Sequence, residues 1–409
     1  MGLFIKRGVL ALVMCLISFS NIQAQTSSTP IPTPATLEEV FIQKEPDWFV
    51  NVKASLKLRF EKTPGQKATE REQQLFAFYK SRDFEPAWLI RSGWGPALSK
   101  AFEVLIRADQ EGLVPADYTW AIDIVQKTKQ NVADLVNAEV QFTTAVLQYI
   151  DDVGGERLDP SKIDKYLYLK PIKVKAAQIL AQGLVSDQRA EFLENITLHN
   201  EQYQRLKKLL AHYREKASTD KELPKLSDAI MLKKGMNSNQ VVILRHLLTA
   251  HGVLPDSDAP SATFDQSLED ALKAFQDKAN IETDGMVGPQ TCRALNRTIK
   301  DQIDQILVTM ERWRWLPEKM DSRYVLVNIA AFELRAYEDD KLTLEMPVII
   351  GRDYRKTPVF TSKITSVRFN PSWDVPHSIA VKDKLAKLQS DPSYLSKKGF
   401  EVYDESGSR

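Results

Sequence analysis

The sequence predicts a multidomain protein with a mainly α-helical N-terminal scaffold, a small three-helix module and a β-rich C-terminal region. Three observations predict this order. Apolar residues recur at helical spacing through the first half of the chain, and helix start and stop signals then follow closely at residues 231–298. Beyond Pro317 the apolar residues alternate with a period of two, which is the spacing of β-strands.

Length and composition limit the classes of protein that fit. A chain of 409 residues can hold a few domains of ~100–200 residues each. With 43% hydrophobic and 27% charged residues it can bury ordinary cores, which excludes a wholly disordered protein. The formal net charge is +1 and falls to −1 if Lys6 and Arg7 leave with a leader. Such a balance gives no electrostatic basis for nucleic-acid binding.

Residues 1–24 are expected to be an export signal. Lys6 and Arg7 form a basic start, Val9 to Phe19 is an apolar run, and Ile22-Gln23-Ala24 offers a small residue at a cleavage point. The apolar run is too short to cross ~30 Å of hydrocarbon as a helix. We therefore predict a periplasmic protein with no transmembrane segment in its mature form.

Cys15 lies inside this apolar run, and Val13 and Met14 precede it where lipid attachment would require small residues. The mature chain is therefore expected to keep a single cysteine, Cys292. It could form no internal disulfide, although a periplasmic location would permit one.

Residues 25–37 are expected to be a disordered spacer, because their Ser, Thr and Pro residues bury too little apolar surface. A helical scaffold domain is expected at residues 38–216, followed by a linker at 217–230. Two apolar faces in the scaffold have helical spacing. They are Ala101, Val104, Leu105 and Ala108, and Phe142, Val146, Tyr149 and Ile150. The scaffold shows no nucleophile–base pair or metal-ligand cluster in its sequence, which favours a structural role.

The module at residues 231–298 begins with signals for two helices. Ser238 or Asn239 can cap the first helix, and Gly252 can end it. Ser267 can cap the second helix, whose apolar face includes Leu272.

A third helix is expected after the turn at Asp284-Gly285. Gly288-Pro289 can open it, with proline at the first helical position, where the missing N–H is tolerated. The spacing predicts that Cys292, Leu295 and Ile299 share its core-facing side.

Four blocks of this module together resemble a peptidoglycan-binding domain. They are Leu232 to Gly235, Val242 to Leu248, Ala271 to Gln276, and Asp284 to Thr291. The resemblance implies peptidoglycan as a binding partner. The motif residues of the last block are Asp284, Gly285, Gly288, Pro289 and Thr291, and most of them are expected to shape the backbone.

Residues 299–317 are expected to form a connecting helix that Pro317 ends, and residues 318–409 a β-rich domain. A hairpin is expected with its turn at Asp339-Asp340, between Leu334–Tyr337 and Leu342–Leu344. Strands and their connections are expected to continue at 348–351, 356–360 and 364–370.

This pattern resembles the opening half of an L,D-transpeptidase catalytic domain of the YkuD type. In the large class of that family, a helical scaffold and a peptidoglycan-binding domain precede the catalytic domain. Two scaffold blocks, Glu85 to Trp88 and Gly112 to Tyr118, agree with that class. The resemblance implies an enzyme that cross-links cell-wall stem peptides through a cysteine nucleophile, with a histidine that takes and returns the proton.

The family places these groups in a His-x-Thr segment and a Ser-x-Gly-Cys-[Ile/Val]-Arg segment, downstream of the expected strands. The 409 residues contain no cysteine after Cys292 and no histidine after His377. We therefore expect an incomplete catalytic domain, with no catalytic residue assigned and this chain inactive by itself. Two hypotheses remain open: a fragment of a cross-linking enzyme, or a non-catalytic peptidoglycan-binding protein that arises by natural truncation. A hydrolase of the amidase or lytic class is disfavoured because suitable metal ligands are lacking.

Cys292 could itself be a nucleophile with His251 as its partner, but the local sequence favours a packing role. Val253 stands where the family pattern has threonine, and Thr291 stands where it has glycine. His246 and His251 are five positions apart, so they point about 140° apart on a helix and make a poor metal pair. No metal or other cofactor is predicted.

Five further residues are candidates for a substrate cleft or a domain interface. Four of them could stack on sugar rings, or could join the binding module to the catalytic domain, which we favour: Arg312, Trp313, Arg314 and Trp315. His377 lies in a proline-flanked loop, where it could shape a cleft or simply face solvent.

Overall fold

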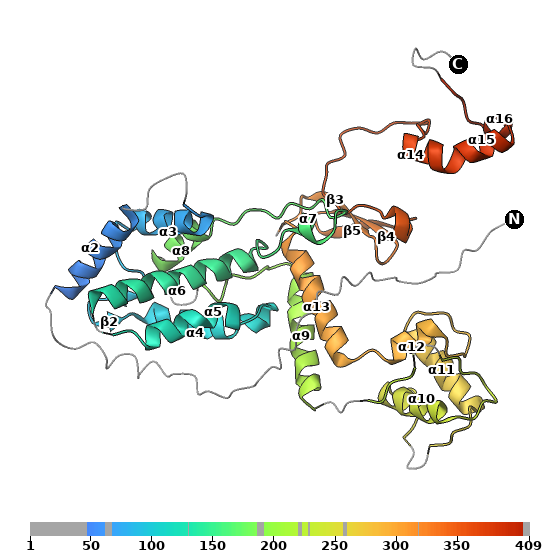
Figure 1. Ribbon diagram of the computed structural model, residues 1–409, viewed down its shortest axis with the longest axis horizontal. Coiled ribbons are helices and arrows are strands. Elements are labelled where there is room, and N and C mark those ends of the chain that lie inside the picture. Colours follow the sequence, from blue (N-terminus) through green and yellow to red (C-terminus); the bar gives the residue numbers. More distant parts are fainter. Residues whose placement is uncertain are drawn as a thin grey trace. The chain divides into compact units, whose positions relative to one another are not determined.

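The computed structural model describes residues 47–61, 68–129, 131–185, 192–219, 223–227, 230–256, 260–317 and 319–403 (Figure 1). The predicted export signal and the spacer lie outside these residues, as does part of the predicted linker. None of the helices in the described ranges is both long and apolar enough to cross a membrane. The chain forms two compact units that divide between Phe360 and Thr361.

The predicted fold class is confirmed, with an α-helical N-terminal part followed by a small β-sheet. The scaffold helices pack around α6 (Val132–Val153), which runs between the α2–α3 and α4–α5 pairs (Figure 1). Both predicted apolar faces are buried in this core. The described elements before α9 are α2 (Trp48–Glu61), α3 (Glu70–Ser81), β1 (Leu89–Ile90), β2 (Gly93–Trp94), α4 (Pro96–Ile106), η1 (Ala108–Glu111), α5 (Ala116–Gln126), α7 (Pro160–Ile163) and α8 (Ala176–Val185).

Aromatic rings from distant parts of the chain fill the centre of the scaffold. The ring of Phe142 on α6 makes T-shaped contacts with two other rings. The distance between ring centroids is 4.9 Å to Trp88 and 5.1 Å to Phe102 of α4. The indole Nε1 of Trp88 donates to the hydroxyl of Thr143 at 2.9 Å. A buried indole thus has both an apolar pocket and a hydrogen-bond acceptor.

Glu139 is a fully buried carboxylate that holds the loop between α3 and β1 against α6. Its Oε1 accepts hydrogen bonds from the backbone N–H of Ala87 at 2.5 Å and from the Tyr79 hydroxyl at 3.1 Å. Its Oε2 accepts from the backbone N–H of Trp88 at 3.2 Å. Burial raises the pKa of Glu139 to about 7, although these three donors act in the opposite direction.

α9 (Glu201–Thr219) and α13 (Ile299–Arg314) pack side by side, although the whole three-helix module separates them in sequence (Figure 1). Tyr203, Leu210, Ile306 and Met310 form the buried seam between the two helices. The helix predicted to connect two domains therefore belongs structurally with the scaffold. It ends at Arg314, with Trp315 as its cap, shortly before Pro317.

The three predicted helices of the module are present as α10 (Asn239–Ala250), α11 (Gln266–Lys278) and α12 (Pro289–Leu295). They enclose their own core, which includes Leu244, Leu272 and Cys292. Gly288 and Pro289 open α12 as predicted.

Three details of the module differ from the sequence prediction. Asp265, not Ser267, caps α11, because its carboxylate accepts from the backbone N–H of Leu268 at 2.9 Å. Ser238 occupies the cap position of α10, but its hydroxyl makes no capping hydrogen bond. α12 stops at Leu295, so Ile299 is not on its core face. Thr298 instead caps a new helix that starts at Ile299.

The β-rich part of the first unit is an antiparallel sheet of β3 (Arg323–Asn328), β4 (Glu333–Glu338) and β5 (Lys341–Pro347). The predicted hairpin is confirmed. Asp339 and Asp340 have φ values of 47° and 61°, as a two-residue type I′ turn requires.

The further strands expected at residues 348–351, 356–360 and 364–370 were predicted wrongly. In the described residues, this stretch contains only an isolated bridge at Val359 and a short 3-10 turn, η2 (Asp353–Arg355). Ile349, Ile364 and Phe369 are largely exposed. β-propensity reflects fit to neighbouring strands, and these residues have none beside them.

The second unit holds α14 (His377–Ile379), the π-helical turn η3 (Ala380–Leu385), α15 (Ala386–Ser390) and α16 (Tyr394–Lys397). Lys384 lies over the ring of Phe400 at 4.8 Å, and Trp373 packs beside the same ring at 6.1 Å between centroids. This small cluster ties the loop before α14 to the residues that follow α16.

We predict that Glu139→Gln flattens the pH dependence of scaffold stability. Because the pKa of Glu139 is higher in the folded state, its protonation stabilises the folded protein fully at a pH below 4.5, the pKa in the unfolded chain. This contribution to the free energy of unfolding is lost as pH rises through about 7. At ~1.4 kcal/mol per pKa unit, the variant should remove about 3 kcal/mol of pH dependence. Urea unfolding of both chains at pH 5, 6, 7 and 8 measures this.

Glu103→Gln is the matched control, because it makes the same change at a partly exposed site paired with Lys100. It should retain the wild-type dependence. Part of the wild-type slope should persist even in Glu139→Gln, since burial also raises the pKa of Asp151 to about 6. An unchanged slope in Glu139→Gln would contradict the prediction.

Candidate functional site

The motif Asp284–Thr291 is organised around the buried side chain of Gln276 on α11. The Gln276 amide nitrogen donates to the Asp284 carboxylate at 2.8 Å, the Met286 carbonyl at 3.0 Å and the Thr291 hydroxyl at 3.2 Å. Its oxygen accepts from the backbone N–H of Gly285 at 2.8 Å. One amide thus holds the turn and the start of α12 together.

Gly285 is required by both its conformation and its surroundings. Its φ is +71°, and a Cβ there would lie 2.7 Å from the Lys273 side chain and 3.0 Å from that of Glu269. Lys273 in turn pairs with Glu269 at 2.6 Å. The turn therefore passes directly beneath a charged pair on α11, where only glycine fits without displacement.

Three loops meet at the end of the module that carries this turn. Leu232 exchanges backbone hydrogen bonds with Val287, at 3.1 Å and 2.8 Å. The backbone N–H of Phe264 donates to the Met236 carbonyl at 2.8 Å. The loops before α10, α11 and α12 thus form one continuous surface, on which Met231, Met236 and Met286 are exposed.

Cys292 is fully buried on α12, where its Sγ lies 3.3 Å from the carbonyl oxygen of Ser227. Asn296, one turn further on, accepts from the backbone N–H of Leu226 at 2.8 Å and donates to its carbonyl at 2.7 Å. These contacts fasten the segment that enters the module to the helix that leaves it. The thiol is part of this packing and is not presented to a ligand.

His251 packs its ring against Phe275 at 4.8 Å between centroids. Burial lowers the pKa of His251, and it outweighs an opposing hydrogen bond with the Leu295 backbone. Within the described residues, no group of three His, Cys, Asp or Glu side chains is placed to hold a metal ion.

The candidates on α13 have different environments. Arg312 is exposed and Trp313 is half-buried beside the α9–α13 seam. Trp315 is buried, and its indole donates to Glu311 at 3.1 Å. Their proposed role in a cleft or an interface stays a prediction.

Arg314, between these tryptophans, is the residue with the most extensive contacts on this segment. Its guanidinium donates to the backbone carbonyl of Glu111, to the Tyr203 hydroxyl at 2.9 Å and to the Glu311 carboxylate at 2.7 Å. The side chain is 1% exposed. The sequence prediction gave Arg314 the same role as its neighbours, because its partners Glu111 and Tyr203 are more than 100 residues away.

His377 is the first residue of α14 and is exposed. It belongs to the second unit, whereas the module and α13 belong to the first. Its role in a cleft stays a prediction.

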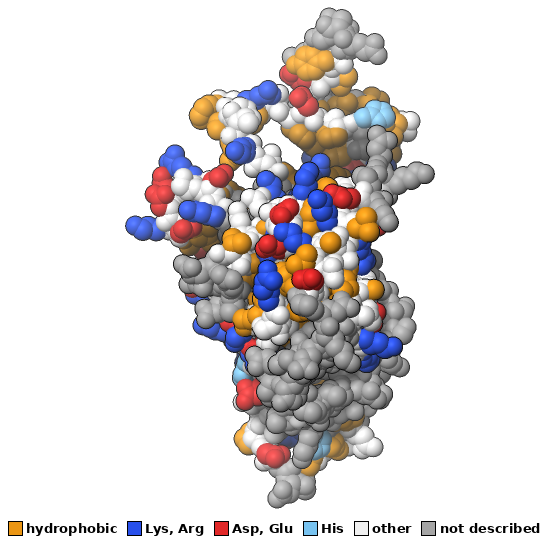
Figure 2. Space-filling model, turned by 90° about the vertical axis from the view of Figure 1, so that its left-hand side faces the viewer, with side chains coloured by type: hydrophobic (Ala, Val, Ile, Leu, Met, Phe, Trp, Pro, Cys, Tyr) orange, Lys and Arg blue, Asp and Glu red, His pale blue; other side chains and the backbone are white. Residues whose placement is uncertain are grey.

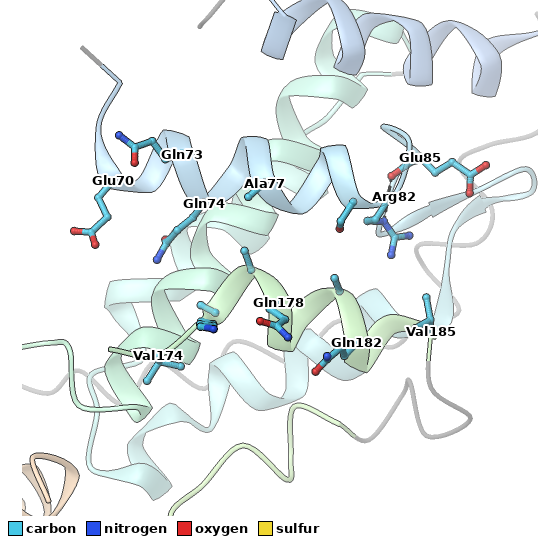
Figure 3. Close-up of a pocket in the computed structure, with 15 residues that line it drawn as sticks. Glu70, Gln73, Gln74, Ala77, Arg82, Glu85, Val174, Gln178, Gln182 and Val185 are labelled. Carbon is cyan, nitrogen blue, oxygen red and sulfur yellow. Dashed lines mark hydrogen bonds between the residues drawn. The ribbon is translucent and has the colours of Figure 1, made fainter. Parts of the chain in front are cut away.

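α3 and α8 flank an open cavity of about 810 Å³ in the scaffold (Figure 3). Its polar lining is already partly engaged: Gln74 donates to Asp151 at 3.1 Å, and Glu70 pairs with Lys173 at 2.8 Å. Glutamines and alanines from both helices make up much of the wall, with no histidine, cysteine or threonine among its residues. The wall also carries Glu85, Lys175 and Ser81, whose hydroxyl donates to the Phe78 carbonyl at 2.7 Å, so the groove can form hydrogen bonds to a ligand.

Surface charges are mixed on the face drawn in Figure 2, where basic and acidic side chains are interspersed. Pairs elsewhere on the scaffold are similar, as in Lys53 with Asp83 at 2.8 Å. Such pairing leaves little long-range field of a single sign.

Comparison with known families gives three matches in chain order. A model described as "Scaffold domain" matches residues 73–210, and one described as "Putative peptidoglycan binding domain" matches residues 237–295. A third, described as "L,D-transpeptidase catalytic domain", matches residues 322–408.

A protein of Haemophilus influenzae named "Putative L,D-transpeptidase" is 33% identical to this chain over 103 residues. The match covers 25% of this chain and 21% of the relative, so it spans about a fifth of the relative's length.

We predict that Gln276→Leu destabilises the module by roughly 2–4 kcal/mol, because it leaves several buried polar groups without partners. The backbone N–H of Gly285 should lose its protection from hydrogen exchange, which mass spectrometry of the motif peptide measures. Gln266→Leu makes the same change at an exposed position of the same helix and should have little effect. Equal exchange in the two variants would contradict a central role for Gln276.

We also predict that Cys292 is unreactive in the folded protein. In a chain that starts after Ala24 it is the sole thiol, so a colorimetric disulfide reagent reports on it alone. Labelling should be absent in native buffer and complete in urea, because the thiol is fully buried. Rapid labelling without denaturant would show that the module opens readily, or that the thiol is exposed for chemistry.

Proposed function

Since the chain belongs to the L,D-transpeptidase family, we propose that it binds peptidoglycan and is the wall-anchoring portion of a cross-linking enzyme. The observation that carries this proposal is the independently packed module at residues 231–298, of which residues 237–295 match a peptidoglycan-binding model. A wall ligand implies an extracytoplasmic location, and the sequence pattern of an export signal supports the periplasm.

The reaction proposed for the full-length enzyme is an acyl transfer at a stem peptide. A cysteine thiolate attacks the carbonyl carbon of the third residue, and the bond to the terminal D-alanine breaks, so that this amino acid leaves as a free amine. An amine of a second stem then attacks the thioester and releases the thiolate. A histidine carries the proton between these steps, and N–H donors stabilise the oxyanion.

The residues of this chain do not supply that chemistry, in our proposal. Cys292 is buried in the core of the module, and the sequence has no cysteine after it. His251 packs its ring on Phe275, and we assign it no role as a base for Cys292. The role that remains for these residues is binding and positioning.

We propose that the loop end of the module is its wall-contacting face. Exposed Met236 and Met286 provide flexible apolar contacts there, which suit the acetyl and methyl groups of a glycopeptide. Lys233 and Lys234 lie on the same loops and can donate hydrogen bonds to hydroxyl and carboxylate oxygens. Gln276 positions this face without touching the ligand.

A non-catalytic peptidoglycan-binding protein is the alternative function. Both functions require the module to bind the wall, so binding alone does not separate them. Determining the reading frame beyond codon 409 does. An open frame that reaches a Ser-x-Gly-Cys segment supports the enzyme, whereas a stop codon there supports the alternative.

We predict that the 409-residue chain sediments with purified peptidoglycan sacculi, and that Met236→Glu with Met286→Glu weakens this binding at least tenfold. Val308→Glu, on exposed surface of α13 outside the module, is the matched control and should bind normally. Retained binding in the double variant would exclude the loop end as the contact face. Failure of the unmodified chain to sediment would remove the proposed function itself.

A second measurement addresses the chemistry. After incubation with a carbapenem, the intact mass of the 409-residue chain should be unchanged, because Cys292 is inaccessible. A covalent adduct on Cys292 would overturn this assignment and make it a nucleophile.

A further inference from the structure

α9 and α13 form an antiparallel pair whose base lies at Arg314. Tyr203, near the start of α9, contacts Arg314, the last residue of α13, at 2.9 Å. Leu210 and Ile306 share the buried seam further along the two helices. The end of α9 at Thr219 and the start of α13 therefore lie at the opposite end of the pair, where the chain leaves for the module and returns from it.

The base of this pair is fixed to the scaffold by close packing as well as by hydrogen bonds. A Cβ at Gly155, which has a φ of +94°, would lie 2.4 Å from the carbonyl oxygen of Arg314. The carboxylate of Glu111 is held by Lys207 and by the Thr197 hydroxyl at 3.0 Å. The carbonyl that accepts from Arg314 thus belongs to a residue at the end of η1 whose carboxylate is also held.

The β-rich region has a second attachment to the scaffold. The backbone N–H of Tyr168 donates to the Val359 carbonyl at 2.8 Å, and the N–H of Val359 donates to the Tyr166 carbonyl at 2.8 Å. Lys356 pairs with Asp164 at 3.1 Å. Hydrogen bonds from the Tyr166 backbone N–H and from Lys356 lower the pKa of the Asp164 carboxyl. We call the contacts of Arg314 with Glu111, Tyr203 and Gly155 the Arg314 seat. Neither this seat nor the contact at Val359 uses a residue of the module.

The module, in contrast, closes on itself. Its core is separate from the scaffold core and from the α9–α13 seam. The Asn296 side chain binds both backbone polar groups of Leu226, so the entering and leaving segments are fastened to each other inside the module. A segment with its own core and joined ends has the anatomy of an inserted domain.

We propose that the module is an independent insert carried by the helix pair α9 and α13. In this proposal the β-rich region is held on the scaffold by the Arg314 seat and by the backbone hydrogen bonds of Val359, and these two attachments form a joint that does not need the module. The claim that the module binds the wall rests on the function proposed above, whereas the claims of an independent insert and of a two-point joint do not. Binding to the wall would then set where the protein is, and the joint would set the geometry of the domain that follows.

The test replaces residues 223–297 by a Gly-Ser linker. About five residues suffice, because packed helix axes are ~10 Å apart and an extended residue spans ~3.3 Å. The variant should keep wild-type hydrogen exchange at the N–H groups of Tyr168 and Val359. Its scaffold should melt within about 4 °C of the parent, a shift that corresponds to at most ~1 kcal/mol. Sacculus binding should fall at least tenfold.

The outcomes separate the two proposals. Loss of protection at Tyr168 and Val359, or failure of the excised chain to fold, would overturn the independent joint. If the excised chain folds and still binds sacculi, the module is not the wall-binding site, and the insert is nevertheless upheld by its exchange data.

A second variant tests the seat directly. Gly155→Ala should raise exchange at the base of α13 at least tenfold and leave exchange at Gly285 in the module unchanged. Gly235→Ala is the matched control, because Gly235 has a similar φ of +88° but no atom within 4 Å of the place that a Cβ would occupy. Equal effects at the base of α13 in both variants would remove the role assigned to the Gly155–Arg314 contact.

Discussion

The buried guanidinium of Arg314 imposes the constraint from which the arrangement of the first unit follows. A buried charge is costly unless hydrogen bonds compensate it, and Nη1 and Nη2 find acceptors on η1, α9 and α13 itself, whereas the buried Nε has no hydrogen-bond partner in the described residues. Those partners fix the rotation of α13 about its own axis as well as its position. Gly155 completes the arrangement, because any side chain there would push the end of α13 away. β3 then starts at Arg323, nine residues further along the chain.

Two other buried polar side chains also hold separate segments of the chain together, each within a single domain. Glu139 joins the loop after α3 to the centre of the scaffold, and Gln276 joins the glycine turn to α11 in the module. In each case an irregular backbone segment has its N–H groups satisfied by one side chain on a helix. The β-sheet differs, since Val325, Val327 and Leu344 remain partly exposed among the described residues.

Local signals in the sequence predicted much of the fold, because they depend on near neighbours. The helical faces around Val104 and Val146, the Asp339-Asp340 turn and the Gly288-Pro289 helix start all have causes within a few residues. The cap of α11 was missed by two residues, because Asp265 and Ser267 are both acceptable caps and only the fold selects one.

The candidate site was less predictable, since its organisation depends on contacts between distant residues. Gln276 stood inside a matched block, but nothing in its local spacing shows that it binds three groups of the following turn and one at the start of α12. Arg314 looked like one of four similar side chains until its partners were in place. The strands expected after Val348 failed for the related reason that strand formation requires a neighbour, which periodicity does not reveal.

The two hydrogen bonds between the Asn296 side chain and the Leu226 backbone have a mechanical consequence. Because the entering and leaving segments are clipped together, a pull on the module reaches α9 and α13 at the same end and in the same direction. The two helices then share the tension, and the seam between them is not sheared. The load passes to the scaffold at the base of the pair, where Arg314 and Tyr203 meet. If the module binds the wall as proposed, tension from the wall would reach the scaffold at this base.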